Sequence, residues 1–311
     1  MTVIAPPTTE RPAYRPYRAA VSAIRRLSPH FTRVSLRCDD FETFGTERLD
    51  QRIKVVFPLA DGSFCPLDTG DWYDAWRALP EERRNPFRTY TVRDIDPADR
   101  RLDIDFVVHG HDRANAGPAS SWLADAVPGD ELVVVGPDAL SATSGVGIDW
   151  RPGDATELLL AGDETAAPAI ASIVEALPAS RRAHVFIEVP TAQDALPLAA
   201  HPGVSVTWVA RDGGDHGCEL VPAVTSWLER HPEIVAAAAA GTRQRLEKVD
   251  VDREILWERP EEVAGGFYAW IAGESAAVKT LRRLLVRGHG IDRGRVAFMG
   301  YWRRGLAERV A

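Results

Sequence analysis

The fold of this chain is decided by ELLLAG at residues 157–162 and by ETAAPAIASIVEALP, which follows it at 164–178. The first stretch is a short apolar run ending in glycine, which is typical of a buried strand. In the second stretch, apolar residues recur at the spacing of one helical face: Ile170, Ile173, Val174 and Leu177. A buried strand followed at once by an amphipathic helix is the repeating unit of a parallel α/β sheet.

The same unit recurs toward the end of the chain. Further strands are predicted at AHVFIEV (183–189), VSVTWVAR (204–211), FYAWIAG (267–273) and RVAFMGYW (295–302). A helix is predicted in ESAAVKTLRRLLVRGHG (274–290), with Gly288 and Gly290 as its stop signals. Residues 236–265 break the rhythm, because they are charged and irregular apart from the apolar ILW at 255–257. The second half is therefore predicted to be an α/β domain with one surface excursion.

The first half is predicted to consist of short strands. Apolar and polar residues alternate in several stretches, as in FTRVSLRC, where Val34, Leu36 and Cys38 share one face. The predicted strands are FTRVSLRC (31–38), RIKVVFPL (52–59), RTYTVRDI (88–95), RLDIDFVVH (101–109) and ELVVVGP (131–137). Short helices are expected within TGDWYDAWRAL (69–79) and GPASSWLADAV (117–127). Such a run of short strands between turn residues favours an antiparallel barrel or sandwich.

The two patterns divide the chain into four parts. Residues 1–16 are expected to form a loose leader, 17–137 a β domain, 138–154 a Ser- and Gly-rich linker, and 155–311 the α/β domain. No apolar run is long enough to span a membrane and no signal peptide is evident, so we expect a cytoplasmic protein without membrane insertion.

Composition excludes several function classes. The 311 residues carry 37 basic and 45 acidic side chains, and a net charge of −8 argues against a nucleic-acid binder. Three isolated cysteines form no disulfide framework, zinc motif or iron–sulfur cluster, and the eight histidines show no metal-binding spacing. We therefore expect no resident metal.

Two strand ends in the second half carry polar residues before a helix. Gly162, Asp163, Glu164 and Thr165 follow the first strand, and Gly273 and Glu274 follow FYAWIAG's apolar core. Parallel sheets bind ligands at this edge, and helix starts favour phosphate groups. No GxGxxG or P-loop motif is present, however, and two acidic side chains would repel a phosphate, so simple helix capping is an equally good interpretation of the residues alone.

Taken in order, the motifs RTYTVR, DFVVHG, GPASSW, PGDELVVVGP, AGDETAAPAI, WVAR, YAWIAGESAAVKTLRRLL and GYWRRG resemble the siderophore-interacting protein family. That family belongs to the ferredoxin–NADP reductase-like flavoproteins, and the resemblance covers roughly residues 17 to 306. It implies an N-terminal antiparallel flavin-binding β-barrel followed by a C-terminal parallel-sheet nicotinamide-binding α/β domain. The separate interpretation of the two halves agrees with this order.

The resemblance also implies an FAD site in the first domain. Arg88 would neutralise an FAD phosphate, and Tyr90 and Thr91 would contact the reactive isoalloxazine ring, which makes these two the catalytic candidates. Ala119 and Ser120 would hold the pyrophosphate at a helix start. The other candidates for FAD contact are Asp105, Val107, His109 and Trp122. From the residues alone, packing in the barrel is the better explanation of His109, and packing explains Trp122 as well as flavin contact does.

For the nicotinamide dinucleotide, the resemblance implies a site at the two polar strand ends. Its candidate residues are Gly162, Asp163, Glu164, Thr165, Arg211, Gly273 and Glu274. Arg211 would favour NADPH if it met a 2′-phosphate, whereas Glu188 at a neighbouring strand end would disfavour one, so the two signals conflict. The choice between NADH and NADPH stays open at this stage.

The implied substrate is a ferric siderophore bound by cations near the flavin. The candidates are Lys54, Arg303 and Arg304, because many ferric siderophores are anionic. Family members often carry a basic residue after the ELVVV strand, where this chain has Asp138. This departure puts the third cation of the pocket in doubt.

The resemblance predicts an enzyme, an NAD(P)H-dependent ferric-siderophore reductase. NAD(P)H would reduce FAD, FAD would reduce Fe(III), and the weakly bound Fe(II) would leave the siderophore. Two alternatives remain open: a flavin reductase that uses ferredoxin as donor or serves another small acceptor, and a siderophore-binding protein without redox activity. A monomer is expected. The sequence does not say which siderophore is used.

Overall fold

The computed structural model describes residues 11–67, 72–108, 117–242, 244–247, 249, 254–261, 263 and 265–305. The chain separates into two compact units. The first contains most of the residues before position 148. The second contains the residues from Ile148 onward together with Arg25–Arg33 and a short stretch that begins at Asp105. Within the described residues, no helix is both long and apolar enough to cross a lipid bilayer.

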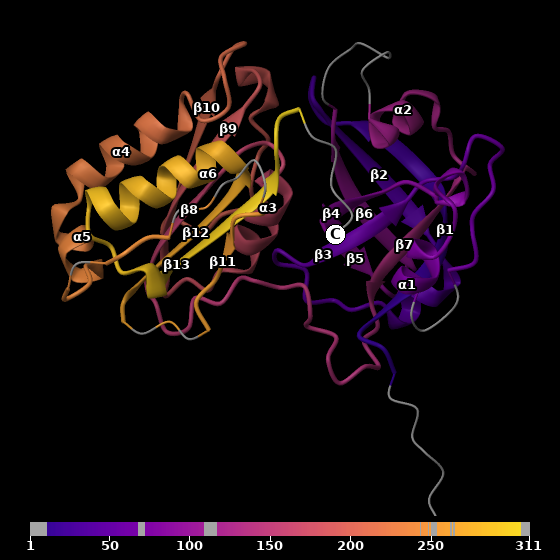
Figure 1. Cartoon of the computed structure of the whole chain (residues 1–311), viewed down its shortest axis with the longest axis horizontal. Helices are drawn as coiled ribbons and strands as arrows, with labels where there is room; N and C mark the ends of the chain where they lie inside the picture. The colour runs from indigo at the N-terminus through magenta and orange to yellow at the C-terminus, as the bar shows by residue number, and fades with distance from the viewer. Residues whose placement is uncertain are drawn as a thin grey trace, which may run out of the picture. The chain divides into compact units, whose positions relative to one another are not determined.

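The first unit is built on a seven-stranded sheet with the strand order β4-β3-β7-β1-β2-β6-β5 (Figure 1). Its strands are β1 (Tyr14–Arg26), β2 (Phe31–Arg37), β3 (Arg52–Val56), β4 (Phe87–Thr91), β5 (Asp94–Asp96), β6 (Arg101–Val107) and β7 (Glu131–Pro137). The pairs β1–β7, β3–β4, β3–β7 and β5–β6 are antiparallel. The expected antiparallel half-barrel is therefore confirmed.

Strand β1 is the longest strand, and the sequence interpretation did not include it. Its residues, YRPYRAAVSAIRR, are mostly Arg, Ala and Pro, which have low strand propensity. Its buried side chains nevertheless alternate at Tyr17, Ala19 and Val21. Pairing with β7 along seven residues, from Tyr14 opposite Pro137 to Ala20 opposite Glu131, supplies the stability that propensity does not.

Short helices cover parts of the first unit. They are η1 (Asp39–Thr43), α1 (Trp72–Arg77), η2 (Glu81–Arg83) and α2 (Pro118–Asp125). Helix α1 packs its Trp76 against Phe87 of β4, with ring centroids 5.0 Å apart, over the buried Val56, Val133 and Val135. This aromatic cluster fixes one face of β3 and β4 and leaves their other face for Arg88 and Tyr90.

The second unit is built on a six-stranded sheet with the order β10-β9-β8-β12-β13-β11 (Figure 1). Its strands are β8 (Glu157–Gly162), β9 (Arg182–Val189), β10 (Val204–Ala210), β11 (Trp257–Glu258), β12 (Phe267–Glu274) and β13 (Val296–Trp302). The pairs β8–β9, β9–β10, β8–β12 and β12–β13 are parallel, and the two-residue β11 is antiparallel. The expected parallel α/β domain is confirmed.

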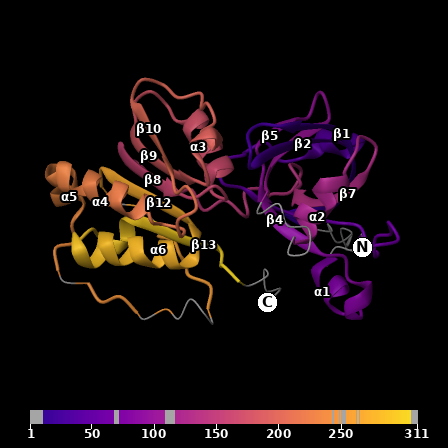
Figure 2. The ribbon, with the colours of Figure 1, turned by 90° about the horizontal axis from the view of Figure 1, so that it is seen from above.

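Helices cover both faces of this sheet. They are α3 (Ala167–Ala176), η4 (Ala192–Asp194), α4 (Leu220–Arg230), α5 (Pro232–Ala238), α6 (Ser275–Arg282), the π-helical turn η5 (Arg283–Gly288) and η6 (Arg293–Arg295). Leu159 and Ala161 of β8 pack with α4 and α6, whereas Gly162 faces Ile170 of α3 on the other side. Figure 2 shows α3 and the pair α4 and α6 on opposite faces.

Two segments without helical or strand signals proved more ordered than their composition suggests. In the predicted linker 138–154, Asp138, Asp149 and Trp150 are buried. In the excursion 236–265, Leu256 is buried, and Trp257 begins β11. Asp149 accepts hydrogen bonds from Trp257 Nε1 and Arg259 Nη1, so the two segments hold one another. The domain boundaries themselves stay a prediction.

Candidate functional site

The strand order places a topological switch point between β8 and β12 in the second unit. The chain leaves β8 toward β9 and β10 on one side, and returns through β12 toward β13 on the other. Ligands of parallel sheets bind in the crevice at the carboxyl ends of such strands. Gly162 to Thr165, Gly273 and Glu274 all lie at this edge, so the structure brings together the residues predicted for the nicotinamide dinucleotide.

Asp163 lies at the centre of this edge and is only 3 % exposed. Its Oδ1 accepts hydrogen bonds from Thr165 N (2.9 Å) and Thr165 Oγ1 (2.6 Å), and its Oδ2 accepts from Glu274 N (2.7 Å) and Trp302 Nε1 (2.9 Å). Burial and the charge of Glu164 raise the pKa of Asp163, and these hydrogen bonds oppose the rise. The carboxylate thus joins the ends of β8, β12 and β13 at the switch point.

Glycine at position 273 allows this close approach. Gly273 has φ +143°, and a Cβ there would lie 2.8 Å from the Asp163 carboxylate. The next residue, Glu274, caps α6, because its Oε2 accepts from Ala276 N (2.7 Å) and Ala277 N (3.1 Å). A carboxylate of the chain itself therefore occupies the start of α6, where a parallel sheet could otherwise bind a phosphate.

Glu188, at the end of β9, has the same role toward α4. It is fully buried, and its oxygens accept from Gly217 N (2.8 Å), Glu219 N (3.0 Å) and Leu220 N (3.0 Å). Three amide donors around the start of α4 therefore meet one fixed negative charge.

Glu164 is also fully buried, and it forms a bidentate ion pair with Arg211. Arg211 Nη1 and Nη2 lie 2.7 and 2.6 Å from the two carboxylate oxygens. Burial would lower the pKa of Arg211, but its hydrogen bonds and charge interactions with Glu164 and Glu188 outweigh this and raise it. The predicted phosphate-binding arginine is thus held by the predicted phosphate-binding loop.

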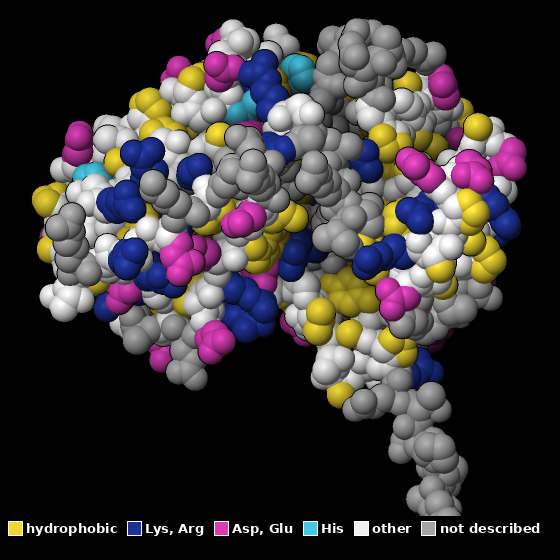
Figure 3. Space-filling model, viewed as in Figure 1, with side chains coloured by type: hydrophobic (Ala, Val, Ile, Leu, Met, Phe, Trp, Pro, Cys, Tyr) yellow, Lys and Arg dark blue, Asp and Glu magenta, His cyan; other side chains and the backbone are white. Residues whose placement is uncertain are grey.

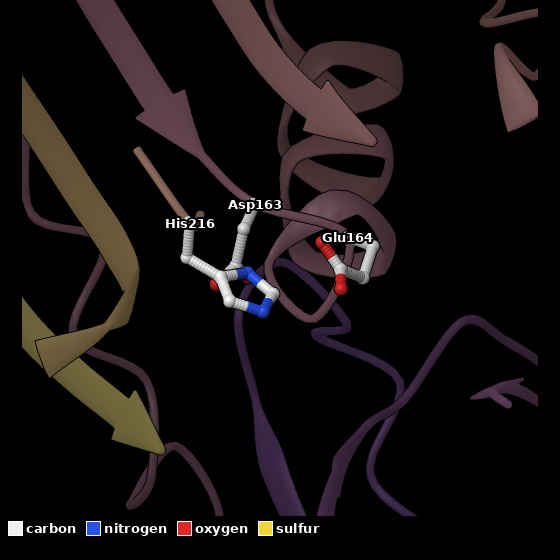
Figure 4. Close-up of side chains that lie close together, drawn as sticks. All are labelled: Asp163, Glu164 and His216. Atoms are coloured by element: carbon white, nitrogen blue, oxygen red, sulfur yellow. The ribbon is translucent and has the colours of Figure 1, made fainter. Parts of the chain in front are cut away.

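Asp163, Glu164 and His216 offer ligand atoms within 4.8 Å of one another (Figure 4). The Asp163 oxygens already accept four hydrogen bonds, and the Glu164 oxygens face the Arg211 guanidinium. A cation at this position would have to displace Arg211. We therefore interpret the cluster as part of the hydrogen-bond network at the sheet edge.

The candidate FAD residues of the first unit lie on two neighbouring elements, β4 and α2. Arg88 and Tyr90 pair with Val55 and Ile53 of β3, so they share one face of the edge strand and are half-buried. Thr91 is buried and lies on the opposite face. A planar aromatic ring and a guanidinium on one accessible face suit a flavin ring and a phosphate, so these residues fit the expected group.

Helix α2 begins at Gly117 with Pro118 in its first turn, and the described residues place no side-chain cap on it. Among the described residues, a Cβ on Gly117 would meet no atom within 4 Å. Pro118 has no N–H and Ser121 N donates to Gly117 O, so Ala119 and Ser120 supply the first amide donors of the turn. Such an open helix start fits a phosphate group. Trp122 packs near Phe57, with ring centroids 5.7 Å apart, which agrees with its packing interpretation.

The remaining FAD candidates are less uniform. Asp105 is buried and forms a bidentate ion pair with Arg33, with 2.7 and 2.9 Å between the paired atoms. Val107 ends β6 and is half-buried. His109 lies outside the described residues.

The candidate substrate cations have partners of their own. Lys54 donates to Thr89 Oγ1 (2.5 Å) and lies 5.2 Å from the centroid of the Phe87 ring, on the face opposite Arg88 and Tyr90. Arg304 pairs with Asp215 on the surface, and Arg303 is half-buried. Figure 3 shows Lys and Arg side chains scattered among Asp and Glu on the visible face of the second unit.

Asp138, the acidic departure from the family pattern, has a structural role. It is 1 % exposed, and its Oδ2 lies 3.1 Å from Arg11 Nη1 and 3.5 Å from Arg15 Nε. Its backbone N also donates to Ala13 O. The carboxylate therefore anchors the chain at the start of β1.

The sequence interpretation missed two residues at the sheet edge, Trp302 and His216. Trp302 stands inside the quoted motif GYWRRG and donates to Asp163, and the His216 ring packs edge-on against it at 4.6 Å. The available signal was position. Trp302 is the last residue of one predicted strand and His216 follows the end of another, and parallel sheets gather ligand-binding side chains at these strand ends.

An antiparallel β domain followed by a parallel α/β domain is also the fold of solved ferredoxin reductases, which match this chain in architecture. Two family models match the chain: "Siderophore-interacting FAD-binding domain" over residues 20–141 and "Siderophore-interacting protein" over residues 155–305. The chain belongs to the siderophore-interacting protein family, and its first domain is an FAD-binding domain.

Named relatives of this chain include two reductases. It is 28% identical over 303 residues to the ferric vibriobactin reductase ViuB of Vibrio cholerae, with 95% of this chain and 93% of that protein covered. It is 28% identical over 284 residues to the NADPH-dependent ferric-chelate reductase of Escherichia coli, with 91% of each covered. Among solved structures, a siderophore utilization protein from T. fusca matches with a TM-score of 0.68 and 28% identity, covering 96% of this chain and 97% of that one. These relatives support an oxidoreductase.

Proposed function

We propose that this protein is an FAD-dependent ferric-siderophore reductase that takes electrons from a nicotinamide dinucleotide and releases iron as Fe(II). The observation that carries the proposal is the open start of α2 beside the Arg88–Tyr90 face of β4, in a chain of the siderophore-interacting family. FAD, when bound, supplies the conversion between a two-electron donor and a one-electron acceptor.

The residues of the first domain would bind and orient the flavin. Arg88 and the amides of Ala119 and Ser120 would neutralise its phosphates, and Tyr90 would pack on its ring system. Thr91, buried at the end of β4, would offer a hydroxyl to the ring edge. None of these roles requires an acid–base triad, because electron transfer to iron moves no proton to the substrate.

The donor would bind at the switch point of the second domain. Gly162, Gly273 and the neighbouring backbone would admit the nicotinamide end, and Asp163 and Glu274 would hold the strand ends in place. Lys54, Arg303 and Arg304 are proposed to attract an anionic ferric siderophore. Fe(II) binds the hard oxygen ligands of such chelators more weakly than Fe(III), so reduction releases the metal. The cytoplasmic location and the monomeric state stay predictions.

Reduced ferredoxin is a second candidate donor. It is favoured by the carboxylates that already occupy the starts of α4 and α6, because they take the positions at which a dinucleotide phosphate could bind. A protein donor would need neither position.

Anaerobic mixing tests these donors. The protein is loaded with FAD and mixed in separate experiments with NADH, NADPH and reduced ferredoxin while the flavin absorbance is followed. The proposal expects rapid bleaching by at least one nicotinamide. Bleaching by ferredoxin alone would replace the donor, and a chain that binds no flavin would leave only siderophore binding.

The substrate cations are tested separately with Lys54→Ala. The proposal expects about a 10-fold loss in the rate at which a ferric siderophore reoxidises the reduced protein, with flavin binding unchanged. Lys279→Ala, which removes a lysine from α6, is the matched control. Equal rates in the two variants would remove Lys54 from the proposed substrate site.

A further inference from the structure

Arg211 is the cation that the family resemblance assigns to the adenosine end of the proposed donor site, and its guanidinium is already paired with Glu164. Its side chain is 10 % exposed, and both terminal nitrogens lie on the two oxygens of the fully buried Glu164. Its Nη1 also lies 3.9 Å from Glu188 Oε2. A planar guanidinium that uses its fork on one carboxylate has lost its best geometry for a phosphate.

The carboxylate oxygens of Glu188 are also already engaged in hydrogen bonds. It ends the strand next to β8, where α/β dinucleotide sites place the acidic residue that contacts the ribose. Its two oxygens, however, accept the three amides at the start of α4, and the side chain is fully buried. Glu188 therefore acts on the ribose site through its charge, and not through a hydrogen bond.

The charges of this group do not cancel. Within this group, Glu164 and Glu188 supply two negative charges and Arg211 one positive charge, which leaves an excess of one negative charge, and the Glu274 carboxylate lies at the same edge. Asp163 adds to this excess wherever it is ionised. Because these groups are buried, water screens them weakly. A 2′-phosphate placed here would meet repulsion, and recruiting Arg211 would leave Glu164 buried without its partner.

We propose that the Glu164–Arg211–Glu188 group makes the donor site selective for NADH over NADPH. This inference rests on the proposed function, since it assumes that a nicotinamide dinucleotide is the donor. In the sequence, Arg211 favours NADPH whereas Glu188 disfavours a 2′-phosphate. The contacts of Arg211 with Glu164 and Glu188 decide between these two signals in favour of NADH. The name of the Escherichia coli relative states NADPH dependence, so the preference is assigned to this chain and not to its relatives.

The test frees Arg211 without removing it. Glu164→Gln keeps the shape of the side chain but removes one negative charge and weakens the fork. We expect the NADPH-to-NADH ratio of flavin reduction rates at low donor concentration to rise about 10-fold over that of the unmodified protein. The double variant Glu164→Gln with Arg211→Ala restores the original excess charge and removes the cation, so it should lose this gain.

The matched control is Glu157→Gln. Glu157 also forms a glutamate–arginine pair, with Arg182, but at the amino end of β8 on the opposite edge of the same sheet. Glu157→Gln changes the net charge by the same amount as Glu164→Gln, but far from the carboxyl ends of the strands. Its NADPH-to-NADH ratio of flavin reduction rates should therefore equal that of the unmodified protein. The unmodified protein and its three variants, all with oxidised flavin, are also titrated calorimetrically with ADP-ribose and with 2′-phospho-ADP-ribose. Neither of these ligands can transfer a hydride, so the titrations measure binding alone.

The outcomes separate the two claims. If neither nicotinamide bleaches the flavin and neither analogue binds, the proposed donor is wrong and this inference falls with it. If the nicotinamides bleach the flavin but the unmodified protein prefers NADPH, or Glu164→Gln leaves both ratios unchanged, only the selectivity is overturned. The selectivity is supported if the unmodified protein binds ADP-ribose more tightly than its 2′-phosphate and if Glu164→Gln reduces or reverses this difference.

Discussion

Helix α2 of the first domain differs from helices α4 and α6 of the second in what lies at its start. In the FAD-binding domain, α2 begins at a glycine with open space around it and no side-chain cap among the described residues. In the second domain, the starts of α4 and α6 are filled by Glu188 and Glu274, and the turn before α3 by Asp163. The start of α2 can therefore accept an anion, whereas the starts of α4 and α6 are satisfied by carboxylates of the chain itself.

The difference accounts for how each domain would hold its nucleotide under the proposed function. A resident cofactor gains from an open helix start and an arginine, because both bind phosphate strongly. A donor that must dissociate after each turnover does not need such tight binding of its phosphates. Bound carboxylates also keep the strand ends in place when the donor is absent, since their hydrogen bonds do not depend on a ligand.

The largest effect is expected from Glu188→Ala, which empties the start of α4. Three amides would lose a charged acceptor inside the protein, and Arg211 would lose a neighbour, so we expect the second domain to lose about 3 kcal/mol of unfolding free energy. Chemical denaturation followed by circular dichroism measures this loss. Glu157→Ala, at the opposite edge, breaks a pair with the largely exposed Arg182 and should cost about 1 kcal/mol or less; equal losses would contradict the capping role.

Gly117→Asp gives α2 the kind of cap found in the second domain. Aspartate at this position should stabilise the helix, yet its charge would occupy the anion site, so FAD affinity should fall about 30-fold. Titration of the flavin-free protein with FAD, followed by fluorescence, measures the affinity. Gly117→Asn caps without charge and should lose much less; unchanged affinity in the aspartate variant would show that FAD phosphate does not bind there.

A smaller effect concerns Asp194, another capping carboxylate of the second unit. It is fully buried and accepts hydrogen bonds from Ser28 Oγ, Thr191 N and Oγ1, and the His30 backbone and ring. Burial would raise its pKa, but the hydrogen bonds from Ser28, Thr191 and His30 outweigh this and lower it.

A lowered pKa means that the stabilisation by Asp194 is complete above its unfolded-state pKa of about 4 and is lost as the pH falls through the folded-state value. Asp194→Asn should cost about 1 kcal/mol at neutral pH and flatten the acid limb of the stability curve. Denaturation at a series of pH values checks this, with the exposed Asp154→Asn as control. An acid limb that is the same in both variants would contradict it.

Periodicity in the sequence predicted both domain types and most strands. Burial on one face of a strand or helix leaves a local pattern of apolar residues, and this pattern can be recognised without knowing any long-range contact. Periodicity missed β1, whose alanines and arginines carry little strand preference and whose stability comes from β7. The family resemblance placed Arg211 and Glu164 in one site but did not predict that they pair, since a contact across 47 residues depends on where two strands end. In the sequence, Asp138 stood out only as an acidic residue where family members often have a basic one. Its contacts with Arg11 and Arg15 explain why an aspartate stands there.

Under the proposed function, reduced flavin in this chain passes electrons to siderophore-bound iron. The most direct measurement starts from FAD-loaded protein that has been reduced anaerobically and freed of donor, then mixed with a ferric siderophore and an Fe(II)-specific chelator. We expect the flavin to reoxidise and two Fe(II) to be trapped for each flavin. A flavin that stays reduced with no Fe(II) trapped, across ferric catecholates and hydroxamates, would contradict it.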